Sequence, residues 1–238
     1  MTISPALLSS EMEHWLTPGW FIRLVLRVLG RIDQDPATNR GSLVVANDHY
    51  YAGERNGLLA QWCGKTYVNP PYGTEIELWI RRMIQYAGDM RITELLALLP
   101  ARIDTEWGQR ALASADAWCA WFGRITFWRV WDPDAELAKL KASERRDPKL
   151  KQFLQLIEAM RGGQYPADFR RNEHGLLVGP ELNRKTCIPQ PAPFPSLVPY
   201  WGEDVRLFTN EFRPYGTITV RRGEHRGIYP CTNPKLAA

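Results

Sequence analysis

Apolar residues recur at helical spacing in some stretches of this chain and form short continuous runs in others. Helical spacing predicts helices over residues 19–29, 75–86, 105–113 and 134–160, the last with a break at Asp147-Pro148. Short apolar and β-branched runs predict strands at residues 31–36, 43–45, 66–68, 95–99, 118–128, 197–201 and 216–220. Strands that alternate with helices favour a mostly parallel, doubly wound α/β sheet. The 238 residues suffice for one large domain of this kind.

The composition is that of a folded protein, and no stretch is suited to span a membrane. Hydrophobic residues make up 45% of the chain and charged residues 24%, which allows a sizeable core. Arg23 and Arg27 interrupt the longest apolar run, which falls short of the about 20 residues that cross a bilayer. Residues 1–13 lack the features of a signal peptide, and the four cysteines have no paired spacing. We therefore expect a reduced, cytoplasmic protein without a structural metal.

The most distinctive stretch is the tetrad Asn69-Pro70-Pro71-Tyr72, which follows the predicted strand at 66–68. The Asn69 side chain and the Pro70 backbone each offer a carbonyl acceptor, and the prolines hold them rigidly without adding an N–H donor. An amino group on an aromatic ring is a poor nucleophile because its lone pair is delocalised, and two acceptors draw it toward a tetrahedral, attacking geometry. Tyr72 offers a flat face on which a base can stack. The alternative is a Pro-Pro turn in which Asn69 caps the next helix.

Two further places hold candidate residues at the ends of predicted elements. Thr17 is a good N-cap and Pro18 a good first residue for the helix at 19–29, and the free N–H groups of such a helix start suit a carboxylate. Arg102 and Asp104 follow the predicted strand at 95–99. A loop there lies beside the tetrad strand, which favours a place near a substrate pocket; the alternative is a surface ion pair.

Charge is uneven along the chain. The net charge is +4, yet residues 139–171 hold nine basic and four acidic residues, a local excess of +5. The basic cluster Arg145, Arg146 and Lys149 lies in this segment. Such an excess suits a phosphate backbone, although a solvated helical face is the alternative.

Seven stretches, in chain order, carry a resemblance to a known family. They are Glu13–Pro18, Asp33–Asn39, Asn56–Leu58 with Trp62, Asn69–Tyr72, Leu99–Thr105 with Trp107, Gly123–Phe127 and Ala192–Ser196. Through them the chain resembles the DNA N6-adenine methyltransferases of phages and prophages, the Dam family of phages. The resemblance covers nearly the whole chain. It implies one methyltransferase domain over residues 1–238, with a Rossmann-like fold that depends on S-adenosylmethionine.

The resemblance also implies roles for residues in these stretches. Trp15, Thr17 and Pro18 would line the methionine end of the cofactor. Asp33 and Asp35 would lie on the loop that meets its polar groups, unless they are merely solvated acids. The full implied cofactor set is Trp15, Thr17, Pro18, Asp33, Asp35, Pro36, Asn39 and Asn56.

Two departures from related enzymes fall within this set. Asn56 stands where such enzymes often carry an Asp beside the cofactor adenine, so an acceptor oxygen remains while the charge is absent. Asp35-Pro36-Ala37 stands in place of the Gly-x-Gly turn of most methyltransferases. Residues 132–190 resemble a helical, basic insertion and are a candidate DNA-contacting element.

Together, the tetrad and the resemblance predict an enzyme that methylates N6 of a flipped adenine in duplex DNA without an obligate protein partner. We expect it in the cytoplasm, which is that of the bacterial host if a phage or prophage encodes the protein. A glutamine-amide methyltransferase shares the tetrad, but usually has a Gly-rich cofactor loop and a helical N-terminal domain. A cytosine-N4 enzyme more often has Ser at the first tetrad position. A catalytically degenerate DNA-binding protein is the remaining alternative, and Asn56 is its support.

Overall fold

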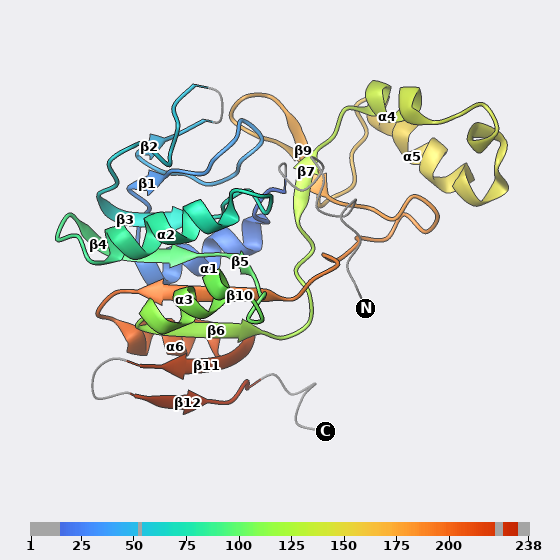
Figure 1. Cartoon of the computed structure of the whole chain (residues 1–238). Helices are drawn as coiled ribbons and strands as arrows, with labels where there is room; N and C mark the ends of the chain where they lie inside the picture. Colours follow the sequence, from blue (N-terminus) through green and yellow to red (C-terminus); the bar gives the residue numbers. More distant parts are fainter. Residues whose placement is uncertain (1–14, 52–53, 222–225, 233–238) are drawn as a thin grey trace.

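The computed structural model describes residues 15–51, 54–221 and 226–232 (Figure 1). The expectation for residues 1–13, and the Glu13-His14 part of the first motif, lie outside these residues.

A central sheet in the described residues contains nine strands in the order β12-β11-β6-β10-β4-β3-β1-β2, with β5 paired to β10. The strands are β1 (Gln34–Asp35), β2 (Asp48–His49), β3 (Gly64–Val68), β4 (Ile92–Ala97), β5 (Leu99–Pro100), β6 (Ala117–Trp121), β10 (Ser196–Trp201), β11 (Gly216–Val220) and β12 (Gly227–Tyr229). Strands β2, β1, β3 and β4 form a parallel half. Strands β10 and β11 run antiparallel to their neighbours. The expected parallel sheet is thus confirmed for the half that carries the tetrad.

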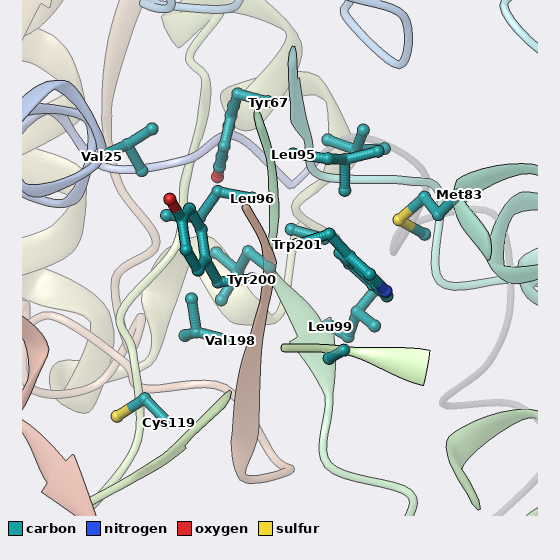
Figure 2. Close-up of a cluster of buried hydrophobic side chains, with 14 of the residues drawn as sticks. Val25, Tyr67, Met83, Leu95, Leu96, Leu99, Cys119, Val198, Tyr200 and Trp201 are labelled. Atoms are coloured by element: carbon teal, nitrogen blue, oxygen red, sulfur yellow. The ribbon is translucent and has the colours of Figure 1, made fainter. Parts of the chain in front are cut away.

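Helices cover both faces of this sheet. They are α1 (Gly19–Leu29), α2 (Ile76–Ala87), α3 (Glu106–Ser114) and α6 (Val205–Phe212), of which α1 contacts α6 and α2 contacts α3. Successive residues of a strand point to opposite faces. Accordingly Leu95 lies beside Met83 of α2, while Leu96 points to the face covered by Val25 of α1 (Figure 2). These four side chains are fully buried, so the sheet is enclosed between two helical layers.

The segment predicted to be an insertion, residues 132–190, has its own apolar cluster and forms a small sheet with the strand just before it. That strand is β7 (Trp128–Val130), and the elements of the segment are α4 (Pro133–Lys139), the short 3-10 turns η3 (Glu144–Arg146) and η4 (Pro148–Leu150), α5 (Lys151–Arg161), β8 (Arg170–Arg171) and β9 (Leu177–Pro180). The strands pair antiparallel in the order β7-β9-β8. Trp131, Phe153 and Ile157 belong to a cluster separate from the main core. The segment that was predicted to be helical therefore also contains a β-hairpin. The whole segment projects beyond the end of the sheet at which β6 ends (Figure 1).

The prediction of a strand at residues 43–45 is wrong, because β2 lies at Asp48–His49 instead. Polar side chains in the preceding loop explain the difference. The Val44 amide donates to the Ser42 hydroxyl (3.1 Å) and the Gly41 amide to Asn39 Oδ1 (2.8 Å). Local side-chain acceptors of this kind compete with strand pairing. The loop between β1 and β2 is consequently built from turns.

Candidate active site

A long cleft lies along the ends of β1 and β3. It comprises two spaces of about 430 and 1430 Å³, both open to solvent, which have Ala37, Thr38, Asn39 and Pro71 in common. Trp15, Leu16, Thr17, Asp35, Ser42, Val44, Tyr67, Asn69, Pro70 and Tyr72 also line the smaller space. Tyr50, Arg55, Asn56, Leu58, Glu75 and Trp79 line part of the larger one.

Asn69 presents an unused acceptor to the smaller space. Its side-chain nitrogen donates to the Trp15 carbonyl (3.1 Å). That bond fixes the amide orientation, because a carbonyl can only accept. Asn69 Oδ1 is buried and has no hydrogen-bond partner among the described residues, and no backbone amide of these residues donates to the Pro70 carbonyl. A buried oxygen without a donor is costly, so this corner of the cleft is suited to a ligand that brings N–H groups.

Tyr72 belongs to an aromatic wall beside Asn69. Trp15 stacks on Phe127 and on Phe194, with ring centroids 5.1 Å apart in both pairs. Tyr72 meets all three rings edge-on, and its hydroxyl donates to the Leu98 carbonyl (2.9 Å). The Tyr72 side chain is only 4% exposed, so the flat face expected from the sequence is not open to a ligand here. Phe127 and Phe194 lie in two of the quoted motifs, but only the fold brings them here.

The prediction that Thr17 caps the first helix is wrong. Pro18 is the N-cap of α1, and its carbonyl accepts from the Phe21 and Ile22 amides. Thr17 instead shares a 2.8 Å hydrogen bond with the Tyr67 hydroxyl, and both residues line the smaller space. Pro18 is buried and does not line the cleft. Burial raises the pKa of Tyr67 far above its ordinary value, so this hydroxyl remains protonated.

Asp35 and Asp33 have opposite environments although they are two residues apart. Asp35 lines the smaller space, is 3% exposed and has no ion-pair partner among the described residues. Burial therefore raises the pKa of its carboxyl to about 7. Asp33 lies outside the cleft and accepts hydrogen bonds from Arg31, Asn47 and the Lys65 amide. Burial opposes its ionisation, but these bonds outweigh that effect and lower the pKa of its carboxyl. Asp33 lines neither space of the cleft, and its expected contact with the cofactor stays a prediction.

The larger space brings together aromatic, polar and charged groups. Pro36, Asn39 and Asn56 all line it, as expected from the sequence. Asn56 Oδ1 accepts from the Leu58 amide (2.9 Å). The Arg55 guanidinium lies 4.0 Å from the centre of the Tyr50 ring. Tyr50 and Trp79 are only 4% and 6% exposed, so this part of the cleft presents mainly the polar and charged groups beside them.

The residues predicted to contact substrate DNA are not gathered at the cleft. Arg102 and Asp104 form an exposed ion pair with each other (3.2 Å) and do not line either space. Arg145, Arg146 and Lys149 lie on η3 and η4 of the insertion, away from both spaces. Their role in DNA contact remains a prediction.

The α/β sheet, with the Asn69-Pro70-Pro71-Tyr72 stretch after β3 of its parallel half and a cleft beside it, is compatible with a methyltransferase fold. The family model of DNA N-6-adenine-methyltransferase (Dam) matches residues 5–160, more than half of the chain. The chain belongs to this family. It is accordingly a DNA adenine methyltransferase, which requires DNA as substrate and a methyl donor. No curated protein matches the chain. Among the described residues, no helix combines the length and apolar character needed to cross a membrane.

Proposed function

We propose that this enzyme transfers a methyl group from S-adenosylmethionine to N6 of an adenine flipped out of duplex DNA. The observation that carries the proposal is the buried, unpartnered Oδ1 of Asn69 at the wall of the cleft. Adenine N6 carries two hydrogens, and Asn69 Oδ1 and the Pro70 carbonyl are two acceptors on adjacent residues. Each of the two N6 hydrogens therefore has one acceptor.

The residues of the cleft fit S-adenosylmethionine. This molecule carries a positive sulfonium and a positive ammonium group, whereas Asp35 is a buried carboxylate without a partner cation among the described residues. An opposite charge stabilises an ionised buried carboxyl. The Thr17 and Tyr67 hydroxyls lie in the same space, and the polar side chains of Asn39 and Asn56 line the adjoining space. When bound, the cofactor would supply a methyl group on a cationic sulfur, which is a strong electrophile.

The chain's own residues orient the target amino group. Asn69 Oδ1 and the Pro70 carbonyl hold both N6 hydrogens, so that the nitrogen lone pair is directed away from the adenine ring. Two prolines keep these acceptors in place, and such alignment of reacting groups is a major source of rate enhancement. Flipping the base costs a few kcal/mol of unstacking. For the base to stack on Tyr72, at least one ring of the aromatic wall must move, because Tyr72 is 4% exposed.

Methylation-aware sequencing of DNA tests this proposal. The protein would be expressed in cells that lack adenine methylation of their own, with Asn69→Ala as the inactive control. We expect N6-methyladenine at a fixed sequence motif in cells with the native protein and none with the variant. Methylated cytosine, or unmodified DNA from a well-folded native protein, would contradict the proposal.

A further inference from the structure

The insertion holds the loop that forms the wall between the two spaces of the cleft. Residues 36–44 are the first part of the loop that joins β1 to β2, and they contribute Ala37, Thr38 and Asn39 to both spaces. The tip of the β8–β9 hairpin, residues 172–175, lies beside it although the two segments are far apart in the sequence (Figure 1). We call residues 36–44 the cofactor loop.

Asn172 makes the central contact between the hairpin and the cofactor loop. Its side-chain nitrogen donates to the Arg40 carbonyl (2.6 Å) and lies 3.5 Å from the Ser42 carbonyl. Its side-chain oxygen accepts from the His174 and Leu176 amides (3.1 and 3.0 Å). One end of the amide thus shapes the hairpin tip, and the other end fixes the backbone of the cofactor loop.

Two further contacts join the same parts. The Tyr51 hydroxyl lies 3.1 Å from His174 Nε2, and the two rings meet edge-on. Gly41 packs so closely on Val130 of β7 and on Leu16 that a side chain there would overlap them. The cofactor loop and the segment that follows it therefore contact the tip of the β8–β9 hairpin and β7 at three places.

We propose that Asn172 is a positioning residue for the cofactor loop, through which DNA bound to the insertion strengthens cofactor binding. The inference rests on the proposed function. The insertion segment 139–171 carries a charge of +5, which suits a phosphate backbone. DNA that immobilises the insertion also immobilises the hairpin tip and, through Asn172, the loop that lines both spaces. Coupling between two sites is reciprocal, so the cofactor strengthens DNA binding by the same factor.

Asn172→Asp is the sharpest test, because it keeps the side-chain oxygen that accepts from the hairpin amides. It replaces the donating nitrogen with an oxygen, which repels the Arg40 and Ser42 carbonyls. Asn183→Asp is the matched control. Asn183 also lies in the insertion and accepts from two nearby amides, of Lys185 (2.9 Å) and Thr186 (3.3 Å). Its hydrogen bonds among the described residues do not reach the cofactor loop, so the variant adds the same charge and leaves the contact with that loop in place.

The affinity for S-adenosylhomocysteine would be measured by calorimetry with and without a saturating random-sequence DNA duplex. We expect the duplex to raise the affinity of the native protein and of Asn183→Asp about tenfold, within the usual range of coupling factors. In Asn172→Asp the duplex should raise the affinity for S-adenosylhomocysteine less than about twofold. Tyr51→Phe removes only the bond to His174 and should give an intermediate factor. A full factor in Asn172→Asp, an equal loss in Asn183→Asp, or a native protein that binds both ligands without coupling would each overturn the inference.

Hydrogen exchange separates a failure of this inference from a failure of the proposed function. Without any ligand, amides of residues 37–44 should exchange faster in Asn172→Asp than in the native protein and in Asn183→Asp. Unchanged exchange there would overturn the positioning role even if the enzyme is active. A native protein that binds no S-adenosylhomocysteine would instead refute the proposed function, while the exchange result still decides whether Asn172 holds the loop.

Discussion

Replacing Asp35 with Asn should stabilise the free protein and weaken cofactor binding. Burial without a partner cation raises the pKa of this carboxyl from 3.8 to about 7. At about 1.4 kcal/mol for each pKa unit, ionised Asp35 costs the native state about 4 kcal/mol above pH 7. Asn has nearly the same shape and can still accept from the Ala37 amide, which approaches Asp35 Oδ1 at 3.4 Å, so it removes this cost with little change in packing.

The shifted pKa of Asp35 also predicts how the free energy of unfolding changes with pH. Asp35 loses its proton near pH 4 in the unfolded chain but near pH 7 in the native state, so between these values the unfolded chain binds fewer protons. Stability contributed by this group therefore falls as pH rises, and becomes constant above about pH 7. Relative to Asp35→Asn, the native protein should lose about 3 kcal/mol of unfolding free energy between pH 5 and pH 8.

Urea unfolding at several pH values measures this difference, with Asp33→Asn as the matched control. Because hydrogen bonds lower the pKa of Asp33, that variant should be less stable than the native protein at pH 8, opposite in sign to Asp35→Asn. Calorimetry with S-adenosylhomocysteine, whose ammonium group is retained, should show weaker binding by Asp35→Asn. A pH-independent difference between Asp35→Asn and the native protein, or undiminished binding, would refute the reasoning.

Three other changes test separate parts of the account. The cofactor affinity of the native protein should fall about tenfold from pH 8 to pH 6, because protonated Asp35 must ionise to meet a cation. If calorimetry shows that the affinity of the native protein falls no more than that of Asp35→Asn over this pH range, the prediction is wrong. Gly57→Ala should weaken cofactor binding at least as much, since a Cβ there overlaps the Pro36 carbonyl, and unchanged binding would show that the wall of the cleft is not rigid. Changing Arg145, Arg146 and Lys149 to Ala should weaken DNA binding and reduce the slope of log affinity against log salt concentration by about 0.9 for each phosphate that is no longer neutralised. Cofactor affinity in the absence of DNA should not change. An unaltered slope in filter binding would show that these three residues do not contact DNA.

Local patterns in the sequence predict the helices of the main sheet well. The predicted helix at 19–29 has the bounds of α1, and the apolar stripe of Ile76, Trp79, Ile80 and Met83 is the buried face of α2. The tetrad follows β3, as expected from the β-branched and aromatic run before it. In each case the information lies within a few consecutive residues, because periodicity and turn chemistry are local properties.

Features that depend on distant contacts could not be predicted. Thr17 looks like an N-cap until the fold places the Tyr67 hydroxyl 2.8 Å away. Asp33 and Asp35 look equivalent, but Asp35 belongs to β1 and reaches the cleft, while Asp33 precedes the strand and lies among hydrogen-bond donors. The aromatic wall needs Phe194 from a proline-rich loop far along the chain. Such pairings leave no periodic signal in a single sequence.

The most direct test of the central claim compares native protein and Asn69→Ala in one assay. Each would be incubated with methyl-labelled S-adenosylmethionine and unmethylated plasmid, and the nucleosides would be separated and identified by mass spectrometry. We expect labelled N6-methyladenine with the native protein and at least about a hundredfold less with the variant, the order of loss expected for a group that orients the reacting atom, while both proteins bind S-adenosylhomocysteine equally. Full methylation by Asn69→Ala would show that its unpartnered oxygen does not hold the adenine amino group.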